Sequence, residues 1–147
     1  MPAEPPALLR LRRADGAAPL VLGHRGARHA APENTHAAFE LSRREGAAGV
    51  ELDVRLTKTH EIVVLHDVTL ARVTGGADRR ALEQLSWQQA REVDIGQGER
   101  LPLLSDVLDW ARQHDQLVNV EVKSDVRLRR DLVRAVIDLL ARHPWGA

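Results

Sequence analysis

Apolar and charged positions alternate without a break from Gly49 to Leu56. The even-numbered positions (one parity) are Val50, Leu52 and Val54, and the odd-numbered positions (the other parity) are Glu51, Asp53 and Arg55. A period of two residues predicts a β-strand with one apolar face and one charged face. Because a charge inside a core is costly unless it is paired, the charged face indicates either ion pairs or a functional site.

Three other apolar runs predict strands over residues 19–24, 62–66 and 117–123, and the last again has charges, Glu121 and Lys123, on one parity. Only five residues, 57–61, separate the second strand from the third. A parallel crossover needs about a dozen residues, so these two strands are expected to form an antiparallel hairpin. Folding the hairpin about Thr59 brings His66 beside Asp53.

Helical signals fall between these strands. Asn34 or Thr35 is expected to cap a helix over residues 36–45 that Gly46 closes. Ser86 starts a short helix in the weakly patterned segment 68–100, and Ser105 caps a helix that runs to about residue 114. A last helix over 126–142, ended by Pro144, has an apolar stripe of Leu128, Leu132, Val136, Leu139 and Leu140.

This order of strands and helices predicts an α/β fold. A length of 147 residues favours one domain. The Pro- and Ala-rich residues 1–18 are expected to be a flexible arm, and residues 19–147 the domain. In α/β folds, polar residues at the carboxyl ends of strands converge on one mouth, which is where active sites form.

Composition excludes several classes of function. The 21 basic and 21 acidic residues cancel, and no basic block indicates a nucleic-acid partner. With no cysteine, disulfides and thiolate metal sites are excluded. No apolar run approaches the roughly 18 residues of a membrane span, so stable membrane insertion is not expected. The first twenty residues lack the apolar middle of a signal peptide, which favours a cytoplasmic protein.

The charged strand positions suggest a metal site. Glu51, Asp53 and Glu121 offer only oxygen donors, which suit a hard cation such as Mg²⁺ or Ca²⁺. The alternative is that they are strand ends held in salt bridges.

His24 and His66 are candidates for a general acid and a general base, since imidazole titrates near neutrality. The alternative is that each is a hydrogen-bonded core histidine. Asp67 is expected to orient His66 or to cap the turn. The other five histidines (His29, His36, His60, His114 and His143) are expected at the surface.

Two basic residues complete the candidate site. Arg25 is suited to a forked contact with a phosphate oxygen, or else to an ion pair with Glu33, and Lys123 to a point-charge contact. Acid/base histidines, a hard cation and fixed positive charges together suit the cleavage of a phosphodiester.

At these residues the sequence strongly resembles the glycerophosphodiester phosphodiesterase family. The matching text is H-R-G at 24–26, P-E-N-T at 32–35, E-L-D-V at 51–54 and V-L-H-D at 64–67. L-A-R-V-T at 70–74, L-P-L-L-S-D-V-L at 101–108 and N-V-E-V-K at 119–123 follow in the family's order. Each motif alone is weak, but the ordered set over about 100 residues is highly specific.

The resemblance implies a TIM-type β/α barrel that hydrolyses glycerophosphodiesters to glycerol 3-phosphate and an alcohol. It implies His24 and His66 as the acid/base pair, Glu51, Asp53 and Glu121 as ligands of a divalent cation, and Arg25 and Lys123 as phosphate contacts. Two departures stand out. The turn at 57–60 reads T-K-T-H rather than T-K-D-G, and four strands are half of a barrel that takes about 250 residues.

Two alternatives follow from the second departure and from the fold. Beside glycerophosphodiester hydrolysis, the chain could be a truncated, non-catalytic half-barrel that self-associates through an open sheet edge. The other alternative is that the same fold acts on another phosphodiester lipid.

Overall fold

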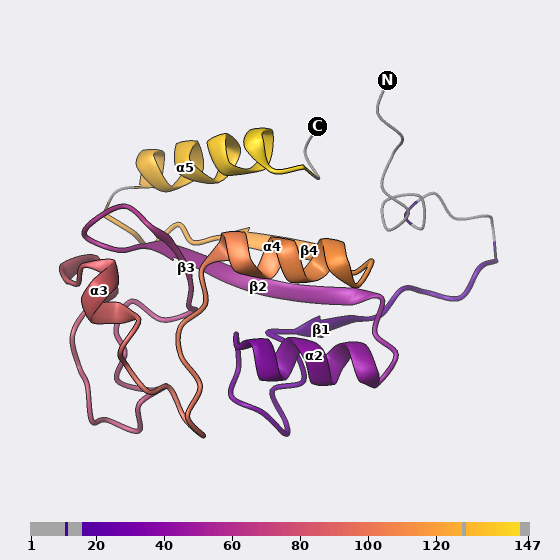
Figure 1. Ribbon diagram of the computed structural model, residues 1–147, viewed down its shortest axis with the longest axis horizontal. Coiled ribbons are helices and arrows are strands. Elements are labelled where there is room, and N and C mark those ends of the chain that lie inside the picture. The colour runs from indigo at the N-terminus through magenta and orange to yellow at the C-terminus, as the bar shows by residue number, and fades with distance from the viewer. Residues whose placement is uncertain (1–10, 12–15, 128, 145–147) are drawn as a thin grey trace.

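The computed structural model describes residues 11, 16–127 and 129–144, and it places four strands in one sheet. The strands are β1 (Leu22–His24), β2 (Gly49–Leu56), β3 (Ile62–Val64) and β4 (Leu117–Val122). The helices are α2 (His36–Arg44), α3 (Trp87–Ala90), α4 (Leu104–Gln113) and α5 (Arg129–Arg142), with a 3₁₀ turn η1 (Leu82–Gln84). Figure 1 shows α2, α4 and α5 lying along the strands. Most of the predicted arm, residues 1–10 and 12–15, lies outside the described residues.

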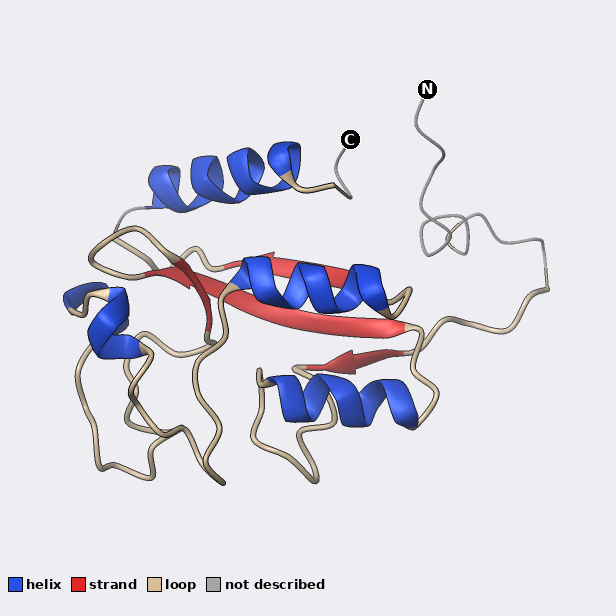
Figure 2. Cartoon of the chain, in the orientation of Figure 1, coloured by secondary structure: helices blue, strands red, loops and turns tan. Residues whose placement is uncertain are grey.

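Strand β2 is the centre of the sheet (Figure 2). It pairs in parallel with β1, with His24 opposite Glu51, and in parallel with β4 over Gly49 to Val54. It pairs antiparallel with β3, with Val54 opposite Val64. A strand has two edges, and β4 occupies one edge of β2 all along Gly49 to Val54, where β1 pairs at the beginning and β3 at the end. Strands β1 and β3 therefore share the other edge, one after the other.

The two parities of β2 face different surroundings. The apolar side chains of β2 lie in the main core, which the helices cover. The buried residues of this core are Phe39, Val50, Leu52, Val54, Leu56, Val64, Leu104, Val107, Leu108, Leu132 and Val136. The charged parity is also largely buried, including Asp53 and Arg55. At about 25 cal/mol per Å² of apolar surface removed from water, the helix-covered face supplies the main stabilisation of the sheet.

A second, smaller core is formed by residues of β3 and of the segment that connects β3 to α4. Its buried members are Val63, Leu65, Leu70, Leu82, Leu85, Ala90, Ile95 and Leu101. Ser86 caps α3, as expected: its hydroxyl accepts from the Gln89 N–H. The Gln89 side-chain oxygen accepts from the Ser86 N–H, which completes a capping box. This segment fixes the loop after β3, which carries His66 and Asp67.

The loop after β1 packs tightly against α2. Gly26 has a φ of +77°, and a Cβ there would lie 2.6 Å from the backbone carbon of Ala38. Arg25 and Asn34 also have left-handed φ angles of 58° each. The Arg25 N–H donates to the Glu51 carbonyl at 2.9 Å, and the Asn34 N–H donates to the Arg25 carbonyl at 2.9 Å. Strained backbone of this kind persists only where surrounding contacts enforce it.

Several element ends differ from the sequence-based expectation. Strand β3 ends at Val64 rather than at residue 66, because the carbonyl of His66 accepts two bonds from the Arg55 guanidinium instead of extending the ladder. Helix α4 begins at Leu104 with Leu103 as its N-cap, and the Ser105 hydroxyl donates to Asp106. Thr35, not Asn34, caps α2, and its side chain accepts from the Ala38 N–H.

Two expectations about surface and core hold only in part. His143 is only 7 % exposed, and its Nε2 lies 3.2 Å from Oδ1 of Asp109 in α4. His36 is half-buried and its ring contacts Phe39. In the apolar stripe of α5, Leu140 is 38 % exposed, while Leu132 and Val136 are buried. Leu128 lies outside the described residues.

The turn of the hairpin shows what replaces the expected glycine. His60 takes a left-handed φ of 69°, and its N–H donates to the Thr57 carbonyl at 3.1 Å. The sequence change therefore keeps a glycine-like conformation at a strained residue.

Candidate active site

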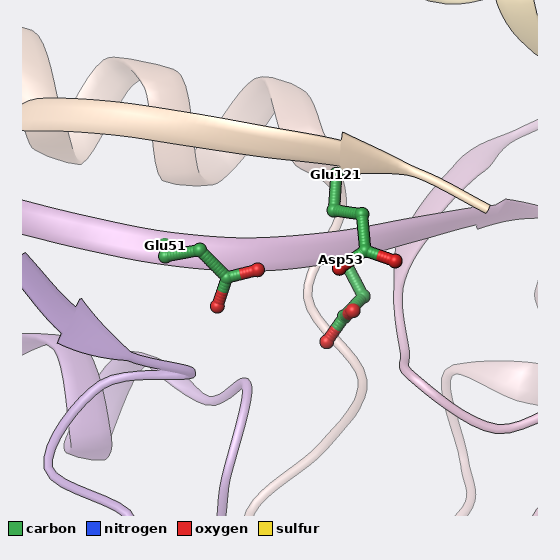
Figure 3. Close-up of side chains that lie close together, drawn as sticks. All are labelled: Glu51, Asp53 and Glu121. Atoms are coloured by element: carbon green, nitrogen blue, oxygen red, sulfur yellow. The ribbon is translucent and has the colours of Figure 1, made fainter.

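Three carboxylates converge on one face of β2 and β4. Asp53 lies opposite Glu121 in the parallel register, and Glu51 lies two residues earlier on β2. One oxygen of each carboxylate lies within 4.8 Å of the other two (Figure 3). Asp53 is buried, Glu51 is half-buried and Glu121 is exposed, so the cluster opens to solvent on the β4 side.

Asp53 is surrounded by donors and cations. Lys123 Nζ lies 3.2 Å from Asp53 Oδ1 and 2.7 Å from Glu121 Oε1. Arg25 Nε lies 3.2 Å from Asp53 Oδ2, and Asn34 Nδ2 donates to the same oxygen at 3.0 Å. Two of the three carboxylates therefore form the salt bridges that the sequence offered as the alternative to a metal site: Asp53 pairs with Arg25 and Lys123, and Glu121 pairs with Lys123.

Glu51 is the least compensated of the three carboxylates. It accepts a bond from the Arg25 N–H at 3.3 Å and lies 3.7 Å from His24 Nε2. Burial raises the pKa of Glu51, and the neighbouring negative charge of Asp53 raises it further. A cation among these oxygens would relieve that repulsion. An oxygen-only donor set with uncompensated negative charge fits a hard divalent cation.

The two candidate histidines are placed along the same edge of β2: His24 ends the strand that pairs with its first part, and His66 follows the strand that pairs with its last part. His24 ends β1 level with Glu51, and its side chain is 54 % exposed. His66 follows Leu65, whose N–H donates to the Asp53 carbonyl at 2.9 Å. The His66 Nδ1 lies 2.6 Å from Asp67 Oδ1, so Asp67 contacts and orients the ring.

Arg25 makes the ion pair that the sequence offered as the alternative to a phosphate contact. Its Nη1 donates to Glu33 Oε1 at 3.2 Å. Together with the Asp53 contact, this pair holds the guanidinium beside the carboxylates rather than free in solvent.

Sequence reasoning gave no functional role to Asn34, Arg55 or Arg72. Arg55 is buried, and its Nη2 donates to Asp125 at 2.9 Å as well as to the His66 carbonyl. Arg72 donates to both Glu33 and Asp67. The only sequence signals were the place of Arg55 on the charged parity and that of the other two within quoted motifs.

A mixed sheet packed with helices, with carboxylates, histidines and basic residues gathered around its central strand, defines a candidate phosphoric diester hydrolase. Residues 24–142 match the glycerophosphoryl diester phosphodiesterase family, and the chain belongs to that family. It is 40 % identical over 116 residues to the glycerophosphodiester phosphodiesterase of Caldanaerobacter subterraneus, covering 74 % of this chain and 47 % of the relative. It is 38 % identical over 138 residues to a probable glycerophosphodiester phosphodiesterase 1 of Mycobacterium tuberculosis, covering 84 % and 50 %.

Solved structures agree. A phosphodiesterase of Oleispira antarctica in complex with the product sn-glycerol-3-phosphate matches with a TM-score of 0.78 and 30 % identity, covering 85 % of this chain and 53 % of that one. A glycerophosphodiester phosphodiesterase of Thermotoga maritima matches with a TM-score of 0.71 and 32 % identity, covering 86 % and 50 %. The chain spans about half the length of the curated relatives it matches. Among the described residues, no helix combines the length and apolarity that crossing a bilayer requires.

Proposed function

We propose that the protein hydrolyses glycerophosphodiesters to glycerol 3-phosphate and an alcohol. The observation that carries the proposal is the convergence of Glu51, Asp53 and Glu121, with oxygens within 4.8 Å of one another, beside His24 on the same sheet. The product named in the Oleispira antarctica structure supports the same reaction class.

In this proposal His24 and His66 exchange the protons. One takes a proton from the attacking oxygen as its bond to phosphorus forms, and the other gives a proton to the leaving head-group oxygen as that bond breaks. The attacking oxygen belongs either to water or to a hydroxyl of the substrate. Asp67 holds the ring of His66 through Nδ1, which presents Nε2 to the substrate.

Glu51, Asp53 and Glu121 would hold a divalent cation, Mg²⁺ or Ca²⁺. When bound, such a cation neutralises negative charge on the phosphoryl group. Lys123 and Arg25 would contact the phosphoryl oxygens, and both are already held at the cluster by Asp53. Fixed charges of this kind stabilise the transition state because they need no reorganisation during the reaction.

The direct test is to incubate the protein with glycerophosphocholine and Mg²⁺ or Ca²⁺ and to measure glycerol 3-phosphate. His24→Ala and His66→Ala are each expected to lower the rate by about 100-fold or more. His29→Ala is the matched control, because His29 is an exposed histidine that pairs with Glu45 outside the cluster. No product above the His24→Ala background contradicts the proposal.

The same assay separates the related lipid substrates. Intact phosphatidylcholine, offered in mixed micelles, tests the reading in which this fold acts on another phosphodiester lipid. Hydrolysis of the micellar lipid in preference to glycerophosphocholine would support that reading over the first.

A second candidate is a non-catalytic half-barrel that pairs with another copy. Within the part of the chain that the structure describes, β4 pairs with a strand on one edge only. Helix α5 also exposes Val133, Ile137 and Leu140. Open edges and apolar stripes favour association. Light scattering and a thermal melt test it: a concentration-dependent dimer supports association, and a stable, cooperative monomer contradicts it.

A further inference from the structure

The carboxylate of Asp67 is held by two partners at once. His66 Nδ1 lies 2.6 Å from its Oδ1. Arg72 Nε donates to its Oδ2 at 2.8 Å and Arg72 Nη2 donates to its Oδ1 at 3.0 Å. A guanidinium fork fixes the plane of a carboxylate as well as its position. The orientation of the His66 ring therefore depends on Arg72 through Asp67.

Arg72 holds a second carboxylate in the same way. Its Nη1 donates to Glu33 Oε2 at 2.8 Å, and its Nη2 donates to Glu33 Oε1 at 2.8 Å. An exposed ion pair is ordinarily worth little. Here two forked contacts share one guanidinium, and the Arg72 hydrogen bonds lower the pKa of both Glu33 and Asp67.

Glu33 carries the connection on to the carboxylate cluster. It accepts from Arg25 Nη1 at 3.2 Å, and Arg25 Nε lies 3.2 Å from Asp53 Oδ2. Charges alternate in sign along this path: Asp53, Arg25, Glu33, Arg72 and Asp67, ending at His66. The path joins β2 and the two ends of the loop between β1 and α2 to the loop after β3.

We infer that Arg72 is a positioning residue for His66. By clamping Asp67 and Glu33 together, it keeps the His66 ring in one orientation and one tautomer, with Nδ1 held at Asp67. This inference rests on the proposed function for its effect on turnover, but its effect on the ring does not depend on catalysis.

The test compares Arg72→Gln, Arg72→Lys and the control Arg80→Gln. Arg80 makes a forked pair with Asp78 in the same segment between β3 and η1 and is 51 % exposed, against 48 % for Arg72, so it matches Arg72 in chemistry and exposure. The first readout is the ¹⁵N spectrum of the imidazoles, which reports the tautomer of His66. The second is the separation of kcat from KM with glycerophosphocholine.

In Arg72→Gln, the His66 signals are expected to shift towards a mixture of tautomers. The kcat is expected to fall about tenfold or more, with a much smaller change in KM, because ring orientation matters most in the transition state. Arg72→Lys keeps the charge without the fork and is expected to restore part of both. Arg80→Gln is expected to change neither.

An unchanged His66 spectrum in folded Arg72→Gln overturns the inference. So does a loss of kcat that Arg80→Gln reproduces, since that would reflect a general loss of stability. If the unmodified protein shows no turnover, the proposed function fails, and the ¹⁵N spectrum alone still decides the role of Arg72.

Discussion

The Lys123 ammonium lies 3.2 Å from Asp53 Oδ1 and so joins the end of β4 to the middle of β2. Burial opposes the charge on Lys123, but the hydrogen bonds to Glu121 and Asp53 outweigh it and raise the pKa of Lys123. The lysine therefore neutralises part of the cluster that is proposed to hold a cation. The two positive charges are expected to compete.

Lys123→Gln is expected to tighten the binding of Ca²⁺ or Mg²⁺ by about fivefold, since removing one unit of repulsion near the site is worth about 1 kcal/mol. Turnover is expected to fall at the same time, because a phosphate contact is lost. Isothermal titration calorimetry measures the affinity. Lys58→Gln, at the only other lysine, is the control and is expected to change neither quantity; an affinity that weakens in Lys123→Gln contradicts the competition.

Asn34→Asp is expected to lower the free energy of unfolding by about 2–3 kcal/mol in the absence of divalent cations. The reason is that the Asn34 amide donates to Asp53 at 3.0 Å, and a carboxylate there would face another buried carboxylate. Urea unfolding measures the loss. Gln97→Glu is a matched control, since Gln97 is exposed and has a similar φ of 55°. Equal effects of the two substitutions would show that the Asn34 contact has no special role.

Gly26→Ala is expected to destabilise the protein by about 2–4 kcal/mol, because the added Cβ would meet the backbone of α2. Gly46→Ala separates the two causes: Gly46 also has a positive φ, of +91°, but its Cβ would meet nothing within 4 Å. It is expected to cost only the conformational strain, about 1–2 kcal/mol. Thermal melts of the two variants give the comparison, and equal losses would argue against the close packing of the loop on α2.

The stability of the protein is expected to fall below neutral pH through His36. Burial lowers the pKa of His36, and the opposing charges of Asp106 and Glu99 only partly offset it. The unfolded chain therefore binds a proton more readily, so the stability that His36 contributes is present above its unfolded pKa of about 6.5 and is lost as the pH falls through the folded value. Denaturant unfolding at pH 7 and pH 5 should show a steeper loss for the wild type than for His36→Gln. Parallel losses would contradict the assignment.

Strand β2 could be predicted from sequence because its periodicity is local and strict. The antiparallel pairing of β2 with β3 could be predicted because a five-residue connection leaves no other arrangement. These two features already brought the carboxylates and His66 to one region. They did not supply the contacts of the individual side chains.

The remaining contacts depend on residues far apart in the chain. Thr35 and Asn34 are equally good caps by local rules, and only the tertiary structure shows that Thr35 takes the cap while Asn34 reaches Asp53, 19 residues away. Arg55 and Asp125 are 70 residues apart. The burial of His143 depends on Asp109, 34 residues earlier. Sequence periodicity reports only which residues of one element share a face, so it cannot predict partners on distant elements.

The shared edge of β2 has a consequence for how this chain tolerates change. Both candidate histidines take their positions from the same strand, since β1 and β3 pair with it in succession. The distance between the two histidines is therefore set by the number of β2 residues between the two pairing sites, and not by the lengths of the loops between them. Insertions in the turn at 57–61 or in segment 68–100 should leave that spacing intact. A single residue inserted between Glu51 and Val54 would change the spacing and turn every following side chain of β2 to the opposite face.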